Sequence, residues 1–360
     1  MSVHNFNAGP AVLPQAVLER AQAELLDYQG RGMSILEMSH RSKEYEAVNA
    51  SAEARFKRLL NLGDGYRVLF MQGGASAQFA LLALNFLPPG TTGNYIVTGA
   101  WGEKALEEAK RIGRTHIVAS TADDGFRRVP SLGELRVSDQ PAYVHLTSNE
   151  TIQGVQWADL PVIDGPPLVA DMSSDILCRP MAADQFALIY AGAQKNIGPA
   201  GVTVVIARQS FLETGRADLP AIFNYQTHAK NNSLYNTPPA FAVYMVDLVL
   251  AWIEELGGLT AMEARNQAKA ATIYAVIDAS GDFYRGHAEP ASRSLMNVTF
   301  RLPTEALEKQ FVAAAQAEGM VGLAGHRSVG GVRASIYNAL EPASCVALAQ
   351  FMQAFATTNG

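Results

Sequence analysis

The stretch that decides the fold reads ALIYAGAQKNIGPAGVTVVIA, residues 187–207. Two apolar runs, Ala187 to Ala191 and Val202 to Ala207, enclose a turn of small residues that contains Lys195. Runs that are apolar at successive positions are typical of strands buried on both faces of a sheet. Sites in open α/β sheets form outside the carboxyl ends of strands, so this pattern places Lys195 where a reactive lysine is expected.

Similar apolar runs occur upstream of this stretch. They alternate with amphipathic, helix-like runs and lie at Tyr66–Met71, Tyr95–Thr98, Ala142–Leu146 and Leu168–Ala170. This alternation predicts an α/β domain in which helices cover both faces of a large, mostly parallel sheet.

The C-terminal part of the chain has a different order of elements. Residues 238–279 predict two long helices separated at Gly257 and Gly258, because helices commonly end at glycine. After them the sequence predicts a strand, a helix, a second strand and a last helix, at Met296–Phe300, about Thr304–Glu318, Val332–Ser335 and up to about Phe355. This order favours a smaller α+β domain that follows the first one.

Composition excludes several classes of function. The formal net charge is -6 and no basic stripe is present, which argues against a nucleic-acid partner. The longest apolar run, residues 241–253, contains Asp247 and is shorter than the roughly 20 residues of a membrane span. The first ten residues lack the pattern of a secretory signal. We therefore expect a cytoplasmic protein without a membrane segment.

Cysteine and histidine usage predicts neither a disulfide nor a metal site. Cys178 and Cys345 are the only cysteines, and they are far apart in the sequence. The seven histidines show no spacing typical of metal ligands.

The candidate chemistry begins with Lys195 and Asp171. An amine that loses its proton is required for Schiff-base formation, and lysine shifts its pKa readily when it is desolvated. A lysine in a loop is nevertheless most often a solvated surface residue. Asp171 follows the apolar run at 168–170, where a carboxylate can pair with the ring nitrogen of pyridoxal phosphate or simply cap a helix.

Two further features suit a flat, phosphorylated cofactor. The glycine turn at residues 73–78 follows a predicted strand and opens a helix, so its N–H groups are suited to binding a phosphate, although a plain strand-to-helix turn explains it equally. Trp101 lies just beyond another strand and is either a stacking residue or a core residue. No dinucleotide-binding or P-loop motif is present.

Two similar His-Arg pairs predict an anion-binding site. The guanidinium group binds carboxylates and phosphates through paired hydrogen bonds, although a single arginine is more often solvated. The pairs are His40-Arg41 and His326-Arg327, and Arg333 follows the second pair.

Taken together, these segments resemble the phosphoserine aminotransferase family of class-V aminotransferases. The similarity runs over nearly the whole chain and is carried by Phe6–Pro10, Met38–Ser42, Gln72–Ser76, Ser148–Ile152, Ala170–Asp175, Tyr190–Pro199, Tyr235–Pro239 and Gly325–Ser335. It implies the aspartate-aminotransferase-like fold of pyridoxal-phosphate enzymes (fold type I). We expect a large cofactor-binding domain at residues 16–265 and a small domain formed by residues 1–15 and 266–360.

The resemblance also implies roles for individual residues. Lys195 would hold pyridoxal 5'-phosphate as a Schiff base and then move a proton, and Asp171 would bind the ring nitrogen. Trp101 would stack on the ring and Thr151 would bond its hydroxyl group. The cofactor phosphate would be held by Ala75, Ser76 and Gln194, and by Asn236 and Thr237 of a second subunit. The implied unit is a homodimer with shared active sites.

The family reaction converts 3-phosphohydroxypyruvate and L-glutamate to O-phospho-L-serine and 2-oxoglutarate, in serine biosynthesis. In bacteria the same enzyme often serves pyridoxal phosphate biosynthesis through a phosphorylated hydroxythreonine. We expect Arg41 and Arg333 to recognise carboxylates, and His40, His326 and Arg327 to recognise the phosphate or the distal carboxylate. Some members carry an arginine where this chain has Ser76, and Ala8 and Gly9 are expected near the substrate through their backbone.

Two alternatives remain at this point. A cysteine-desulfurase-like lyase of the same fold needs a mobile nucleophilic cysteine, and neither Cys178 nor Cys345 is placed for that role. A binding protein that has lost catalysis is expected to lose Lys195 or Asp171, and this chain contains both.

Overall fold

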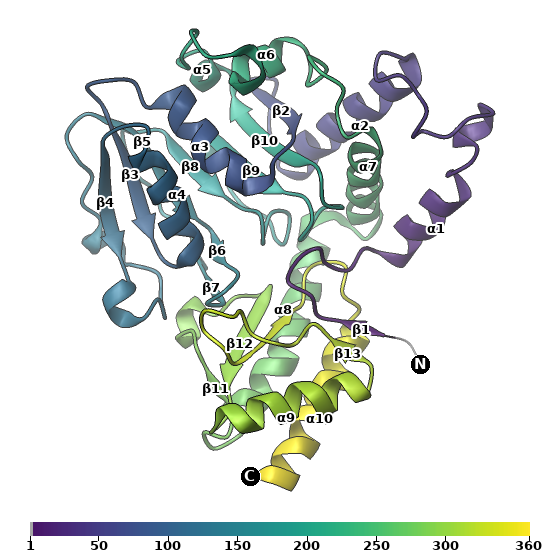
Figure 1. The fold of residues 1–360 in the computed structure, drawn as a ribbon, viewed down its shortest axis with the longest axis vertical. Helices are drawn as coiled ribbons and strands as arrows, with labels where there is room; N and C mark the ends of the chain where they lie inside the picture. The colour runs from purple at the N-terminus through teal and green to yellow at the C-terminus, as the bar shows by residue number, and fades with distance from the viewer. Residues whose placement is uncertain (1–2) are drawn as a thin grey trace.

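A computed structural model describes residues 3–360 of the protein. Its centre is a seven-stranded sheet in which β10 (Thr203–Arg208) runs antiparallel to both of its neighbours and the other adjacent pairs are parallel (Figure 1). The strand order is β2 (Tyr66–Met71), β10, β9 (Leu188–Gly192), β8 (Leu168–Asp171), β5 (Pro141–Thr147), β3 (Thr92–Val97) and β4 (Thr115–Ser120). The predicted α/β fold with a large, mostly parallel sheet is confirmed.

Helices cover both faces of this sheet because its strands are apolar at successive positions. Phe70 of β2 belongs to the core beneath α1 (Gln15–Ala23), α2 (Lys43–Leu59) and α7 (Ala240–Glu255). The adjacent Leu69 belongs to the core on the opposite face. That core is covered by α3 (Gly74–Phe86), α4 (Ala100–Lys110), α5 (Gln209–Leu212) and α6 (Tyr225–Lys230).

The edge strand β4 was not among the predicted strands. Its side chains are mostly part-exposed, and Ile117 is 47% exposed. A strand at the edge of a sheet does not need a continuous apolar run, so the signal that identified the central strands is missing here.

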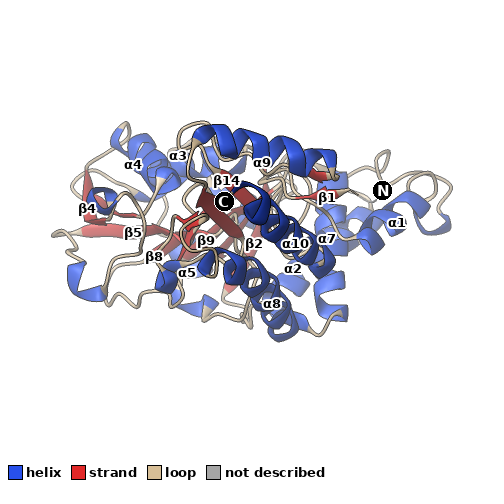
Figure 2. Cartoon of the chain, turned by 90° about the horizontal axis from the view of Figure 1, so that it is seen from below, coloured by secondary structure: helices blue, strands red, loops and turns tan. Residues whose placement is uncertain are grey.

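The C-terminal part forms a second core around a small antiparallel sheet. Its strand order is β11 (Arg285–Gly286), β12 (Asn297–Arg301) and β14 (Val332–Ser335). Its helices are α8 (Gly258–Asp278), α9 (Glu305–Ala317) and α10 (Pro342–Asn359). Figure 2 shows α8 and α10 side by side, and the predicted break between α7 and α8 falls at Gly257 and Gly258 as expected.

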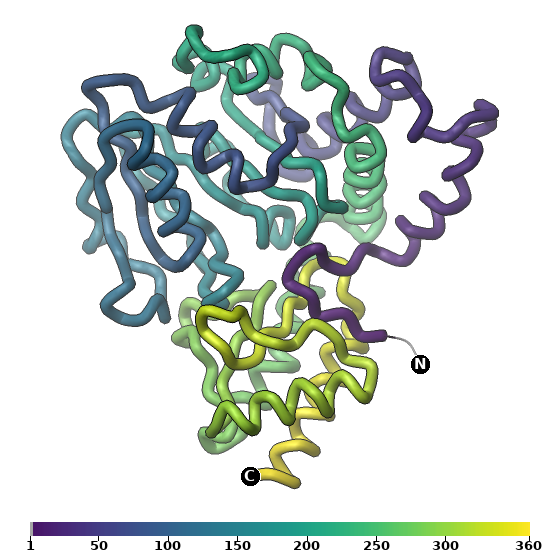
Figure 3. The backbone as a smooth tube through the Cα atoms, in the orientation of Figure 1, coloured from purple at the N-terminus to yellow at the C-terminus, as the bar shows by residue number. Residues whose placement is uncertain are grey.

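The N-terminal segment joins this second core. β1 (His4–Asn5) pairs in parallel with β13 (Met320–Val321), and the hydroxyl of Tyr337 donates to the carbonyl of Ala8 at 2.7 Å. Figure 3 shows the start of the chain running beside its C-terminal segments. The expected boundaries of the two domains stay a prediction.

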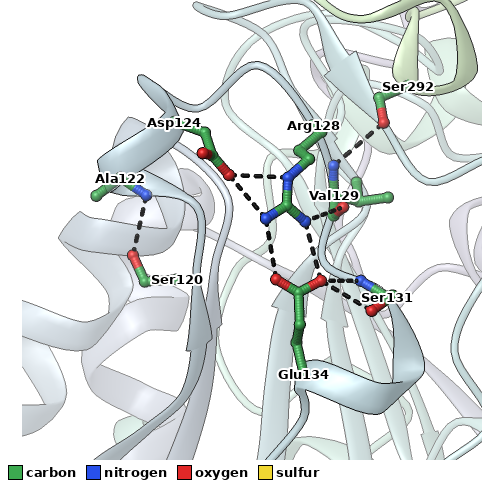
Figure 4. Close-up of polar contacts among 8 residues, drawn as sticks. All are labelled: Ser120, Ala122, Asp124, Arg128, Val129, Ser131, Glu134 and Ser292. Carbon is green, nitrogen blue, oxygen red and sulfur yellow. Dashed lines mark hydrogen bonds and ion pairs between the residues drawn. The ribbon is translucent and has the colours of Figure 1, made fainter.

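The long connection between β4 and β5 is held by one arginine (Figure 4). Arg128 binds both carboxylate oxygens of Glu134 at 2.9 Å and reaches Asp124 at 2.8 Å. This guanidinium holds the pKa of Glu134 well below its ordinary value. The next residue, Val129, donates its N–H to Ser292 Oγ at 3.1 Å, so the connection also contacts the C-terminal part of the chain.

The remaining elements are short. β6 (Asn149–Glu150) and β7 (Val155–Gln156) form a small hairpin. Single 3₁₀ turns lie at Tyr28–Gly30, Ala122–Asp124, Leu132–Glu134, Ala183–Gln185, Ala221–Phe223 and Pro290–Ser292. Within residues 3–360, no helix is both long and apolar enough to cross a membrane.

The second core depends on Phe311 of α9, which packs against Tyr284, Phe300 and Phe355. We predict that Phe311→Ala lowers the free energy of unfolding by about 3–5 kcal/mol, because it removes a buried ring and leaves a cavity. Urea denaturation measures the change. Gln316→Ala, at an exposed position of the same helix, is the control and should have little effect. Equal stability of the two variants would contradict the prediction.

Candidate active site

The residues predicted to bind the cofactor and to act in catalysis lie at one edge of the large sheet. Asp171 is the last residue of β8, and Lys195 lies three residues beyond the end of β9. Trp101 lies in the first turn of α4, just beyond β3. Thr151 follows the short strand β6 beyond β5. These segments converge because the carboxyl ends of parallel strands lie at the same edge.

Lys195 is surrounded on several sides. Its Nζ donates a hydrogen bond to Thr151 Oγ1 at 2.7 Å and lies 5.1 Å from the centroid of the Trp101 ring. A Cβ built on Gly9 would lie 3.3 Å from Lys195 Cγ, which places the expected Gly9 backbone against this side chain. Burial lowers the pKa of Lys195 to about 8, against the opposing effect of Asp171. At pH 7 about a tenth of the amine is then uncharged, far more than for a lysine with the ordinary pKa of 10.5.

Asp171 is buried and held by its neighbours. Its Oδ1 accepts from the N–H of Ser173 at 2.9 Å and from the Ser173 hydroxyl at 2.6 Å. Burial raises the pKa of Asp171, whereas Lys195 and Ser173 act in the opposite direction. Ser173 Oγ in turn accepts from the N–H of Gly192 at 3.0 Å, which joins the ends of β8 and β9.

The glycine turn forms the N-terminus of α3. Gly73 has φ +94° and caps the helix, a conformation that glycine adopts without strain. A Cβ there would lie 2.5 Å from that of Ala77. Ala75 and Ser76 occupy the first turn, where N–H groups lack partners within the helix. An anion is the natural ligand of such a turn.

One of the predicted His-Arg pairs lies beside this site. Ser76, Lys104, His326 and Arg327 line a cleft of about 780 Å³. Arg333, on β14, donates to the carbonyl of Thr151 at 3.5 Å. Burial lowers the pKa of Arg333, which remains a cation at neutral pH.

The other predicted residues do not join the site within one chain. His40 and Arg41 lie in the segment between α1 and α2, which is on the opposite side of α7 from β3 and β4 in Figures 1 and 2. Asn236 donates to the carbonyl of its neighbour Thr237 at 3.3 Å. Among residues 3–360, no hydrogen bond joins these four residues to Lys195 or Asp171.

The site fits a ligand that presents both a ring and anionic groups. At the site, two predicted residues have a buried polar atom without a hydrogen-bond partner among residues 3–360, at Trp101 Nε1 and Arg333 Nε. His40 Nε2 and Asn236 Oδ1, in the segments outside the site, also lack one among the same residues. Buried polar groups are normally paired, so these atoms point to missing partners. Within the same residues, no cluster of His, Cys, Asp and Glu side chains is suited to a metal ion.

Reasoning from the sequence missed two residues of the site. Glu150 is fully buried and accepts from the N–H groups of Trp101 and Gly102 at 3.0 and 2.9 Å. Burial raises its pKa to about 7. Lys104 Nζ lies 4.2 Å from the centroid of the Trp101 ring, one helical turn away. Lys104 follows Trp101 by three residues, a spacing that brings side chains together on a helix, so the sequence could have predicted this contact. No local pattern predicts the contacts of Glu150.

The cysteines do not support a lyase. Cys178 and Cys345 are both buried, and burial raises the pKa of both thiols, to about 11 for Cys345. The reactive form of cysteine is the thiolate, and both sites disfavour it.

Comparison with known proteins places this chain in a class of enzymes. The family model of class-V aminotransferases matches residues 3–344, and the chain belongs to this family. It is therefore a transaminase of a class that uses pyridoxal phosphate.

Within this class the chain groups with the phosphoserine aminotransferases. It is 59% identical to the phosphoserine aminotransferase of Herpetosiphon aurantiacus over 100% of both chains. The solved structure of phosphoserine aminotransferase from Bacillus circulans subsp. alkalophilus has a TM-score of 0.98 and 57% identity, covering 100% of this chain and 99% of that one. The pyridoxal-phosphate-bound phosphoserine aminotransferase of Trichomonas vaginalis has a TM-score of 0.93 and 38% identity, covering 98% and 100%.

The lowered pKa of Lys195 predicts the pH dependence of its reactivity. In the cofactor-free protein, acetylation of Lys195 by dilute acetic anhydride should rise with a midpoint near pH 8, because only the uncharged amine reacts. Mass spectrometry of the Lys195 peptide measures this. Asp171→Asn removes a charge that favours the ammonium form and should lower the midpoint further. A midpoint near the ordinary value of 10.5 would contradict the prediction.

Proposed function

We propose that this chain transfers an amino group from L-glutamate to 3-phosphohydroxypyruvate, giving O-phospho-L-serine and 2-oxoglutarate in L-serine biosynthesis. The observation that carries this proposal is the arrangement of Lys195 between Thr151 and Trp101, with Asp171 buried at the adjacent strand end. The 59% identity to a phosphoserine aminotransferase supports the choice of substrates.

Pyridoxal 5'-phosphate, when bound, supplies an aldehyde that condenses with amines and a ring that accepts electrons. In this proposal Lys195 provides the amine that holds it, and afterwards takes a proton from the α-carbon of the substrate. Asp171 would pair with the ring nitrogen, Trp101 would cover the ring face and Thr151 would bond the ring hydroxyl. Ala75, Ser76 and Gln194 would hold the phosphate.

The charge of the site suits substrates with two anionic groups. Glutamate carries two carboxylates, and phosphoserine carries a carboxylate and a phosphate. We assign Arg333 and Arg41 to the carboxylates, since arginine binds a carboxylate through two hydrogen bonds. We assign His326, Arg327 and His40 to the phosphate or the distal carboxylate. The cleft shared by Ser76, His326 and Arg327 supports this division.

We further propose that a second copy of the chain completes the site. Among residues 3–360, His40, Arg41, Asn236 and Thr237 form no hydrogen bond to Lys195 within one chain. The same segments expose apolar side chains, including Leu26 at 85% and Leu36 at 58%. Exposed apolar groups of this kind favour a protein interface. A homodimer with shared active sites accounts for both observations.

The proposal also includes the location of the protein in the cell and a second biosynthetic role. A cytoplasmic location follows from the class of reaction and its small, soluble substrates. A phosphorylated hydroxythreonine is proposed as a second amino product, for pyridoxal phosphate biosynthesis, because it also carries a phosphate and an α-amino acid group.

Lys195→Ala tests the central role. We predict that this variant folds but loses turnover, because the side chain acts in chemistry and contributes little packing. The purified protein with pyridoxal phosphate should show a visible absorption band, and borohydride should trap the cofactor on Lys195. Phosphoserine should convert the band to that of the amine form. Normal turnover by Lys195→Ala would contradict the proposal.

Arg41→Ala tests both the recognition of carboxylates and the shared site. The KM for glutamate and the KM for phosphoserine should each rise about tenfold or more, because a charged hydrogen bond is lost. Mixing Arg41→Ala chains with Lys195→Ala chains should restore activity, since one of the two sites in a hybrid dimer then contains both native residues. If Arg41 acts within its own chain, hybrids restore nothing beyond the activity of Arg41→Ala.

A further inference from the structure

Glu150 is a buried carboxylate without a role in the proposed chemistry. It ends β6, and its side chain is fully buried. Among residues 3–360 it forms no ion pair within 4.0 Å. Burying a carboxylate without a cation is costly unless hydrogen bonds compensate. Its compensation comes from the N-terminus of α4.

The carboxylate takes the place of a helix cap. The N-cap of α4 is Gly99, which has no side chain to accept from the first turn. Glu150 Oε2 accepts from the N–H of Trp101 at 3.0 Å, and Oε1 accepts from the N–H of Gly102 at 2.9 Å. A negative charge here also interacts favourably with the helix dipole. The residue that caps α4 therefore lies about 50 positions along the chain, next to Thr151.

The glycines on either side of Trp101 make room for this carboxylate. A Cβ built on Gly99 would lie 2.5 Å from Glu150 Cδ. At Gly102 it would lie 3.3 Å from Oε1. Gly99 has φ 169° and ψ -170°, extended backbone that other residues also adopt. The close approach of Glu150, and not the backbone conformation, therefore requires glycine at position 99.

Two adjacent residues, Glu150 and Thr151, contact Trp101 and Lys195 respectively. Glu150 binds the backbone of Trp101, and the next residue, Thr151, accepts from Lys195 Nζ. The indole Nε1 has no partner among residues 3–360, so no side-chain hydrogen bond there orients the ring. The position of the ring therefore follows from the backbone of α4 and from packing against the adjacent core.

We propose that Glu150 is a positioning residue that holds Trp101 over Lys195 through the first-turn N–H groups of α4. The functional part of this inference rests on the proposed role of Trp101 in covering the cofactor ring. Glu150 is proposed to act through Trp101, because both carboxylate oxygens accept from N–H groups of α4. Its effect is expected in the position of the indole and in the affinity for pyridoxal phosphate.

Glu150→Gln tests the proposal with little change in shape. The amide keeps one acceptor but presents an NH₂ group to the other N–H, so one bond is lost. In the cofactor-free protein labelled with 5-fluorotryptophan, the ¹⁹F resonance of Trp101 should shift or broaden, while those of Trp157 and Trp252 should not. The Kd for pyridoxal phosphate, measured by titration of the same protein, should rise about tenfold.

Asp175→Asn is the matched control. Asp175 is another buried carboxylate near this edge, and it accepts from Ser148 and from Gln156 Nε2 instead of from α4. This variant loses the same charge and should leave the Trp101 resonance unchanged. The proposal is overturned if Glu150→Gln leaves that resonance unmoved, or if Asp175→Asn moves it equally.

Gly99→Ala is a second test that keeps the carboxylate. The new Cβ should displace Glu150 and reproduce both effects of Glu150→Gln. In a Glu150→Ala background the clash is absent, and Gly99→Ala should then have little additional effect. Equal effects of Gly99→Ala in both backgrounds would overturn the proposal, because the clash with Glu150 would not be their cause.

Trp101→Ala separates this inference from the proposed function. An unchanged Kd for pyridoxal phosphate in that variant would contradict the cofactor role of Trp101. The resonance shift of Glu150→Gln tests the positioning role without reference to the cofactor. A shift accompanied by an unchanged Kd in Glu150→Gln would overturn the functional part of the inference.

Discussion

The hydrogen bond from Lys195 Nζ to Thr151 Oγ1 is the contact on which the rest of the site depends. It requires two strand ends to lie at the same edge of the sheet, which the parallel pairing of β5, β8 and β9 provides. The antiparallel β10 pairs directly with β9 on the other side of the lysine turn. An antiparallel neighbour needs no long crossover, so this turn stays short and is anchored at both ends.

Burial shifts the ionisable groups around this contact toward their neutral forms, and backbone N–H groups stabilise the two carboxylates. Burial lowers the pKa of Lys195 and raises those of Asp171 and Glu150. The N–H of Ser173 donates to Asp171, and the N–H groups of Trp101 and Gly102 donate to Glu150. The lowered pKa gives Lys195 a larger fraction of free amine near neutral pH than an ordinary lysine has, and the free amine is the form that condenses with an aldehyde.

The C-terminal part brings a cation to the site from a separate core. Arg333 lies on β14 and reaches the carbonyl of Thr151. The two parts are also joined next to the lysine, where the N–H of Asn338 donates to Asn196 Oδ1 at 2.9 Å. Lys269 donates to the carbonyls of Ile336 and Tyr337 in the same region. The first bond joins the segment after β14 to the turn that carries Lys195, and the Lys269 bonds join the same segment to α8.

The sequence by itself determined the central strands, because burial on both faces leaves continuous apolar runs, and it placed Lys195 and Asp171 just beyond such runs, at the carboxyl ends of strands. It did not reveal β4, whose exposed face interrupts the run. Only the tertiary structure decided that Glu150 meets Trp101 and that His40 and Arg41 lie apart from Lys195 within one chain. The reason is physical: local patterns record which face of an element is buried, whereas contacts between distant residues depend on how the elements pack.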